Sequence, residues 1–166
     1  MTQEISTPRL LIRPYRREDA AELARLINDW EVARWLSVVP HPYTLEDAEE
    51  YITEIAGDWS FAVTDGAKLL GGIGISGGLG FWLGRAHWGR GYMSEAASAL
   101  VGAWFSAGHE ELSSGYFLGN AASAAIHAKL GFIPGEVVPE HSVSQGRDVE
   151  LQKLRLTRAD WQARHG

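Results

Sequence analysis

Residues 88 to 96 read Trp88-Gly89-Arg90-Gly91-Tyr92-Met93-Ser94-Glu95-Ala96. They follow the apolar run 79–83 and precede a segment whose apolar residues recur at helical spacing, so the glycines mark a strand-to-helix junction. Such a junction can bind an anion, because the first turn of a helix has free N–H groups and the positive end of the helix dipole. Arg90 can add a charged donor. Alone, Gly-x-Gly is equally consistent with a tight turn before a helix.

A second motif spans residues 120–132 and reads Asn-Ala-Ala-Ser-Ala-Ala-Ile-His-Ala-Lys-Leu-Gly-Phe. It follows a predicted strand over residues 112–118. Asn120 is a preferred N-cap residue and Gly131 is typical of a helix C-terminus, so the motif predicts a short helix.

Helical spacing predicts which face of this helix packs. Ala122, Ile126 and Leu130 form one stripe, which we expect to face the core. Asn120, Ser123 and His127 then share an adjoining polar arc of about 60°. If strands 79–83 and 112–118 are parallel neighbours joined by a helix over 92–106, the glycine loop and Asn120 meet at one sheet edge, where α/β proteins bind ligands.

At this point the sequence resembles the GNAT superfamily of acetyl-CoA-dependent N-acetyltransferases, and within it the RimJ/RimL-type branch that acetylates ribosomal-protein N-termini. The resemblance covers nearly the whole chain and rests on four segments in order: 7–14, 42–48, 88–96 and 120–132. In one departure, the superfamily's Gln/Arg-x-x-Gly-x-Gly/Ala loop would place Gln or Arg at 86, where this chain has Ala. Arg85 is adjacent but out of register, so no phosphate contact is assigned to it.

The resemblance implies a mixed α/β (α+β) fold over residues 1–166 as a single domain. Its central sheet would be mostly antiparallel with one splayed parallel strand pair, and about four helices would flank it. The implied reaction transfers acetyl from acetyl-CoA to a primary amine by direct attack in a ternary complex. A second hypothesis is a non-catalytic acyl-CoA-binding sensor or partner-binding module on the same fold.

The resemblance also implies a set of cofactor contacts along the central strand, the glycine loop and the second motif. Strand residues would offer backbone groups to the pantetheine arm, and the loop would surround the phosphates. The expected cofactor residues are Phe81, Trp82, Leu83, Trp88, Gly89, Arg90, Gly91, Tyr92, Met93, Ser94, Asn120, Ser123 and Lys129. No metal is expected, since the His and Glu residues lack metal-site spacing.

Candidate catalytic residues are His127, Ser123 and Glu150. His127 occupies the position where relatives outside this branch often carry a tyrosine that protonates the leaving thiolate. Alternatively, His127 is structural and makes one backbone hydrogen bond. Ser123 can hold pantetheine, relay a proton or simply allow close packing, and Asn120 can bind pantetheine or only cap the helix. Glu150 can receive the amine's proton through water or point outward from its strand.

The family's acceptor pocket would lie between the early helices and the last strands. That position nominates Trp30, Arg34, Trp35, His41, Tyr43 and His141 as substrate-binding residues. By base rate the two tryptophans are more often core residues. The acceptor itself is left open between a protein N-terminus and a small-molecule amine.

Composition limits the function classes. The 166 residues are 45% hydrophobic with seven tryptophans, enough for one substantial core. There are no cysteines, which excludes disulfides and thiolate chemistry and is compatible with a reducing cytoplasm. No apolar run approaches membrane-span length, so we expect no membrane partner. A formal charge of −6 argues against a nucleic-acid partner and mildly favours a cationic acceptor. The assembly is left open between monomer and homodimer.

Local patterns complete the expected element order. Predicted helices cover 17–28, 44–56, 92–106 and 120–131, with a short last helix capped by Thr157. Predicted strands cover 9–16, 61–64, 69–76, 79–83, 112–118, 133–138 and 149–156. The six glycines within residues 71–80 are poor strand material.

Overall fold

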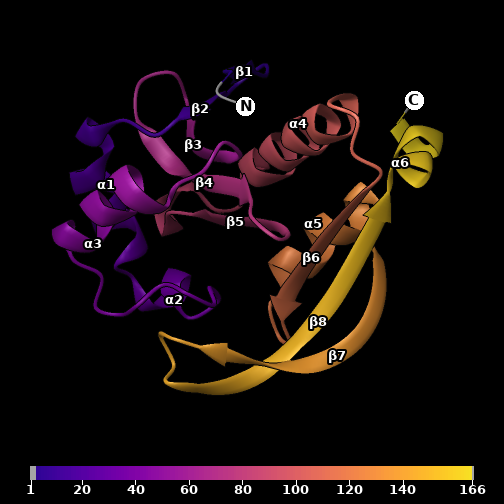
Figure 1. Cartoon of the computed structure of the whole chain (residues 1–166). Coiled ribbons are helices and arrows are strands. Elements are labelled where there is room, and N and C mark those ends of the chain that lie inside the picture. The colour runs from indigo at the N-terminus through magenta and orange to yellow at the C-terminus, as the bar shows by residue number, and fades with distance from the viewer. Residues whose placement is uncertain (1–2, 166) are drawn as a thin grey trace.

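An eight-stranded sheet runs through the molecule in the spatial order β1-β2-β3-β4-β5-β6-β8-β7 (Figure 1). The computed structural model describes residues 3–165. All neighbouring strands are antiparallel except β5 and β6, which are parallel. The strands are β1 (Ile5–Ser6), β2 (Leu11–Pro14), β3 (Ser60–Thr64), β4 (Leu69–Ile75), β5 (Leu79–Leu83), β6 (Glu111–Phe117), β7 (Ile133–Ser142) and β8 (Arg147–Thr157).

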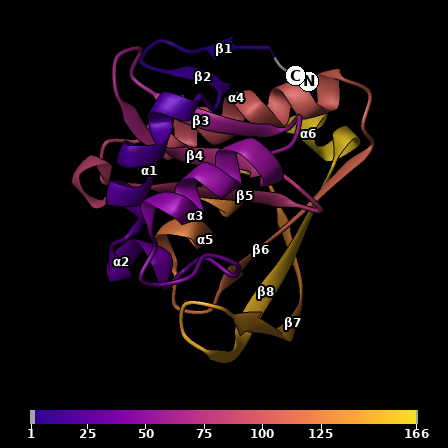
Figure 2. The same cartoon turned by 60° about the vertical axis from the view of Figure 1, so that its left-hand side comes forward.

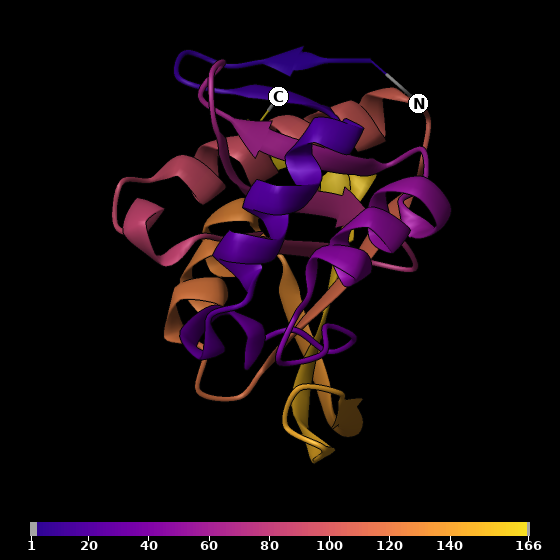
Figure 3. The ribbon, with the colours of Figure 1, turned by 90° about the vertical axis from the view of Figure 1, so that its left-hand side faces the viewer.

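Helices cover both faces of this sheet. α1 and α3 lie on one face, and α4 and α5 lie on the other (Figures 2 and 3). The described residues form α1 (Ala20–Ile27), α2 (Trp30–Ala33), α3 (Leu45–Glu50), α4 (Tyr92–Ser106), α5 (Ala121–Leu130) and α6 (Arg158–His165). Short one-turn segments occupy Arg17–Asp19, Tyr51–Ile55 and Arg85–His87.

The expected mixed fold with one parallel pair is confirmed. Six α-helices occur in the described part of the chain rather than about four, and the single turn of α2 and the two-residue strand β1 were not predicted. Segments this short carry too few residues to show a period. The last two strands are longer than expected and form a hairpin that curves beneath α2 (Figure 1).

Two apolar clusters pack against the opposite faces of the sheet. Strand β3 illustrates the division, because Phe61 and Val63 belong to the cluster under α4 while Ala62 belongs to the cluster under α1. Successive side chains of a strand alternate between faces, so a strand covered on both faces reads as a continuous apolar run.

Glycines in β4 permit close strand packing. A Cβ placed on Gly71 would lie 2.1 Å from the carbonyl oxygen of Trp82 and 2.9 Å from the Cα of Leu83, both in β5. Because these contacts are with backbone, a side chain here would push the two strands apart. The glycine-rich run therefore forms a strand despite its low propensity.

The parallel pair is held at one point only. β5 and β6 have a single register pair, Leu79 with Ser114, whereas β5 has five with β4 and β6 has seven with β8. Beyond Leu79 each strand follows its antiparallel partner, so the two diverge toward their carboxyl ends (Figure 1). This divergence opens the sheet at the edge where the two sequence motifs lie.

Candidate active site

The loop before α4 has the backbone conformation of an anion site. Gly89 and Gly91 both adopt positive φ, +76° and +77°, on either side of Arg90. Residues other than glycine rarely adopt this conformation. The two glycines are therefore needed for their positive φ and not because neighbouring atoms leave no room for a side chain. Glycines with positive φ can turn backbone N–H groups toward one concave side, an arrangement that suits an anion.

The first turn of α4 continues the row of donors. The first bond of the helix runs from the Glu95 N–H to the Gly91 carbonyl, at 3.1 Å. The amides of Tyr92, Met93 and Ser94 precede it and have no intrahelical acceptor. Arg90 is exposed beside them. This donor set fits a phosphate group.

Two neighbouring side chains have other partners. Arg85 pairs with Asp29 through two hydrogen bonds, one of them from Nε at 2.9 Å, so it is engaged away from the loop. Trp88 donates its indole N–H to the Leu83 carbonyl at 2.9 Å, which ties the loop to the end of β5. Trp88 stays a predicted cofactor contact, and its indole also holds the loop in place.

The edge of β5 that faces β6 is open beyond Leu79. Gly84 donates to the Leu70 carbonyl at 2.9 Å, and by the alternation of an antiparallel ladder Trp82 also directs its backbone groups toward β4. Phe81 and Leu83 therefore direct theirs toward the widening gap, where the Leu83 carbonyl already accepts the Trp88 indole N–H and the Leu83 N–H faces the gap. Of the three strand residues expected to meet pantetheine through their backbone, the geometry favours Phe81 and Leu83.

Asn120 caps α5 at the same edge. Its side-chain oxygen accepts the Ser123 N–H at 3.2 Å, and its own N–H donates to the Phe117 carbonyl at 3.1 Å. The helix-cap role is thus present in the structure. Lys129 is exposed near the other end of α5. At 1.5 Å per residue it lies about 13 Å along the helix from Asn120, so it is not part of the cap.

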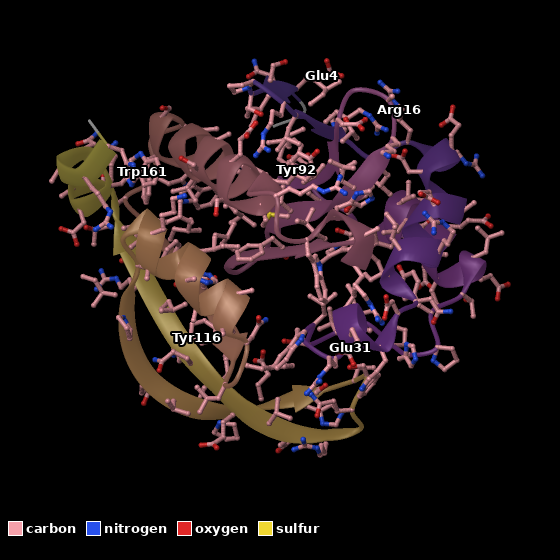
Figure 4. The ribbon with its side chains drawn as sticks, turned by 180° about the vertical axis from the view of Figure 1, so that it is seen from behind. Glu4, Arg16, Glu31, Tyr92, Tyr116 and Trp161 are labelled. Atoms are coloured by element: carbon pink, nitrogen blue, oxygen red, sulfur yellow. The ribbon has the colours of Figure 1, made fainter. Side chains whose placement is uncertain are left out.

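His127 is buried, with 1% of its surface exposed. Its Nδ1 lies 2.8 Å from the Ser123 carbonyl oxygen, which only accepts, so Nδ1 carries the proton. Its Nε2 lies 2.7 Å from the Ser114 hydroxyl. Aromatic rings of Phe81, Tyr116 and Phe132 surround the imidazole, and Figure 4 labels Tyr116 on β6. Burial lowers the pKa of His127, which favours the neutral form of the ring.

This burial corrects the expected orientation of α5. Ser123, His127 and Leu130 are its buried residues, whereas Ala122 is exposed and Ile126 is only half-buried. The polar arc faces inward because both nitrogens of the His127 ring have hydrogen-bond partners there, the Ser114 hydroxyl and the Ser123 carbonyl. The small side chain of Ser123 also lets α5 pack closely against the sheet. Apolar spacing alone could not reveal such partners.

Ser114 is a site residue that sequence reasoning missed. It lies at the single β5–β6 register pair, and its hydroxyl is 2.8 Å from the Leu79 carbonyl oxygen and 2.7 Å from His127 Nε2. One side chain thus joins both parallel strands to α5 at the point where the strands diverge. A serine within a strand carries no sequence signal for this role.

A cavity of about 520 Å³ opens between α2 and the β7–β8 hairpin. Arg34 and Trp35, two of the residues nominated for acceptor binding, and the catalytic candidate Glu150 line it. The remaining lining residues are Phe117, Leu118, Val137, Val138, Pro139, Gln145, Arg147, Asp148 and Val149. This volume is within the range of small-molecule sites.

Four hydrogen bonds close one side of this cavity by joining residues 33–37 to the hairpin turn. Val143 donates its N–H to the Ser37 carbonyl at 2.9 Å, and Ser37 donates its hydroxyl to Glu140 at 2.8 Å. The side chains of Ser144 and Gln145 bond the carbonyls of residues 33 and 34. The cavity wall is therefore built from segments more than 100 residues apart in sequence.

The other four predicted acceptor residues do not line this cavity. Tyr43 is buried in the cluster under α1, where burial raises its pKa to about 12. Trp30 lies against His41 with ring centroids 5.3 Å apart and the ring planes tilted by 58°. His141 is exposed and lies 3.1 Å from Asp148. The sequence could place these residues near the pocket but not on its wall.

Removing the buried imidazole tests its structural role. We expect His127→Ala to lower stability by roughly 2–4 kcal/mol, because it leaves a cavity and removes the imidazole as a hydrogen-bond partner of Ser114 and of the Ser123 carbonyl. His141→Ala is the matched control, since this exposed histidine should change stability by no more than about 0.5 kcal/mol. Thermal unfolding followed by circular dichroism measures both. Equal melting temperatures for the two variants would contradict the buried network.

Comparison with known proteins agrees with this geometry. The family model described as "Acetyltransferase (GNAT) domain" matches residues 9–133. The chain is 23% identical to the uncharacterised N-acetyltransferase p20 of Bacillus licheniformis, over 96% of this chain and 98% of that protein.

Solved structures share the fold. A GNAT-family acetyltransferase from Bacillus anthracis superposes with a TM-score of 0.83 at 18% identity, covering 95% of this chain and 99% of that one. The ribosomal-protein-S5-alanine acetyltransferase from Vibrio fischeri gives 0.80 at 20% identity, covering 96% and 98%. RimL, a ribosomal L7/L12 α-N-protein acetyltransferase in complex with coenzyme A, superposes with a TM-score of 0.78 at 15% sequence identity, covering 93% of this chain and 98% of that one. With most of its length matched by the family model, the chain belongs to the GNAT acetyltransferase family.

Proposed function

We propose that this protein is an acetyl-CoA-dependent N-acetyltransferase that acetylates a primary amine. The observation that carries the proposal is the divergence of β5 from β6 beyond Leu79, with the anion-type loop at its edge. A phosphate-bearing donor and an amine acceptor can meet there from opposite sides of the sheet. Family membership supports acetyl transfer in general.

Acetyl-CoA supplies an activated thioester when bound. The chain's own groups would hold it at two places. The amides of Tyr92, Met93 and Ser94, with Arg90 beside them, suit its phosphates. The backbone groups of Phe81 and the N–H of Leu83, which face the gap, suit the amide groups of its pantetheine arm.

The acceptor would enter through the cavity under α2. Glu150 is exposed on its wall and can receive the proton of the attacking amine through water. Trp35 and the guanidinium of Arg34, which lies 4.5 Å over the indole ring, form the opposite wall. A carboxylate near the amine favours a cationic acceptor, in agreement with the net charge of −6.

The geometry supports the structural alternative for His127. Both ring nitrogens are engaged inside the protein, Nδ1 with the Ser123 carbonyl and Nε2 with the Ser114 hydroxyl, and burial disfavours the protonated ring that a general acid needs. We propose that His127 fixes the point of divergence, and that Ser123, water or the amine itself supplies the proton to the thiolate. Ser123 is 8% exposed and lies beside the imidazole.

We further propose the RimJ/RimL-type branch, with a protein N-terminus or a small amine as acceptor. Structural similarity to the S5-alanine acetyltransferase and to RimL supports this branch. No helix within residues 3–165 is long and apolar enough to cross a membrane. The cysteine-free sequence suits the cytoplasm, where we place the protein.

Turnover distinguishes the enzyme from a binding module. We expect thiol release from acetyl-CoA to depend on an added amine in a panel of peptide N-termini, polyamines, aminoglycosides and amino acids. A thiol-reactive dye measures it, and a catalyst-free mixture is the control. CoA that raises the melting temperature without turnover on any amine would instead support the sensor hypothesis.

Kinetics of a His127 variant test its catalytic role. A direct general acid predicts that His127→Ala lowers kcat by roughly 10²-fold. The buried network instead predicts a kcat within about threefold of wild type below the variant's melting temperature, because the ring donates no proton to the thiolate. Steady-state kinetics of wild type, His127→Ala and His127→Tyr with one acceptor decides between the general-acid role and the structural role. A large kcat loss restored by tyrosine would overturn the structural role.

The glycine loop is tested by binding. Gly91→Val should weaken CoA binding at least about tenfold, because a β-branched residue cannot hold φ near +77° and the amides then turn away. Gly66→Val is the matched control: its φ is +95°, in the turn between β3 and β4. Both variants should lose similar stability, and calorimetry should show reduced CoA affinity only for Gly91→Val. Equal affinities would mean that the loop is merely a turn.

A further inference from the structure

The segment before β2 is fastened to the first turn of α4. Glu95 accepts hydrogen bonds from the Thr7 hydroxyl, from the Arg9 N–H at 3.0 Å and from Arg9 Nε at 2.8 Å. These partners lie more than 80 residues apart in sequence. Figure 2 shows β1 and β2 passing beside α4, which brings the N-terminal segment to the glycine loop.

Arg9 also reaches the loop itself. Its Nη1 donates to the Arg90 carbonyl at 2.8 Å, and its guanidinium lies 4.7 Å over the ring of Tyr92. Its Nη2 would be 3.4 Å from a Cβ on Gly91. One arginine therefore contacts three consecutive residues of the proposed phosphate site. In Figure 4 the labelled Tyr92 lies at the start of α4, on the side where β2 passes.

The negative charge of Glu95 makes its ion pair with Arg9 important for phosphate binding at this loop. A carboxylate in the first helical turn is favourable for the helix dipole, but it would repel a phosphate bound to the same turn. Partial burial alone would raise the pKa of Glu95, yet hydrogen bonds from Thr7 and Arg9 lower it below its ordinary value, so the group is ionised. Arg9 compensates this negative charge, while its own side chain stays 46% exposed.

We propose that Arg9 is a positioning residue for the cofactor's phosphates: it fixes the backbone of residues 90–92 and offsets the charge of Glu95. The inference rests on the proposed function, because it requires CoA phosphates at this loop. It adds a residue from the opposite end of the chain to a site that would otherwise consist of the loop and α4. The proposal concerns phosphate affinity and not the chemical step, since Arg9 lies at the loop and not at the cavity wall.

The test compares ligands with and without the nucleotide phosphates. Arg9→Met should raise the calorimetric Kd for CoA and the KM for acetyl-CoA by roughly tenfold, with kcat within about twofold. The KM for acetyl-pantetheine, which has the same thioester without the nucleotide, should change less than about twofold. Arg9→Lys keeps the charge without the forked donors, so its CoA affinity should be intermediate.

Arg25→Met is the matched control. Arg25 forms a comparable two-bond pair with Glu22 on α1, away from the loop, and its loss should leave CoA affinity unchanged. Unchanged CoA affinity in Arg9→Met would overturn the inference. An equal KM increase for both donors would also overturn it, because that pattern indicates general damage to the fold. If wild type itself does not bind CoA, the proposed function fails instead.

Discussion

The single contact between the two parallel strands determines the rest of the site. β5 and β6 meet at Leu79 and Ser114 and then separate, because each forms a longer antiparallel ladder on its other side. A continuous pairing would have closed the sheet and satisfied the backbone groups of Phe81 and Leu83 internally. Because the strands diverge, the backbone groups of Phe81 and the N–H of Leu83 face a gap that a ligand with its own amides can enter, while the Leu83 carbonyl accepts the Trp88 indole N–H.

The point of divergence is built from buried polar groups rather than from apolar packing alone. Ser114, His127 and the Leu79 carbonyl form a connected set that links β5, β6 and α5. Each buried polar atom in such a set costs free energy if its partner is removed, so the set specifies one arrangement of the three elements. Three aromatic rings around the imidazole exclude water from it.

Two parts of the candidate site differ in how far the sequence could predict them. The glycine loop was predicted in position as a strand-to-helix junction, and the structure adds the positive φ of Gly89 and Gly91, which is a local property of the backbone. The N-cap of α5 at Asn120 could also be predicted, because it depends on a hydrogen bond to a residue only three positions away. The residues nominated for the acceptor side separate in the structure: Arg34 and Trp35 reach the cavity wall, as does the catalytic candidate Glu150, whereas Tyr43 belongs to the core. That wall depends on hydrogen bonds between residues 33–37 and the hairpin turn, which no local pattern encodes.

The sequence by itself determined the elements that follow from short-range chemistry: the capping box at Thr44 and Asp47, the helix stop at Gly131, the strand-to-helix junction at Gly91, and the order of strands and helices. Only the tertiary structure decided that His127 faces inward, that Ser114 lies where the parallel strands part, and that Arg9 meets Glu95. Caps and turns provide hydrogen-bond partners for backbone groups within a few residues, so neighbouring residues in the sequence are enough to predict them. A buried imidazole or a charged pair depends on partners 13 to 86 residues away, and those partners are identified only when the chain has folded around them.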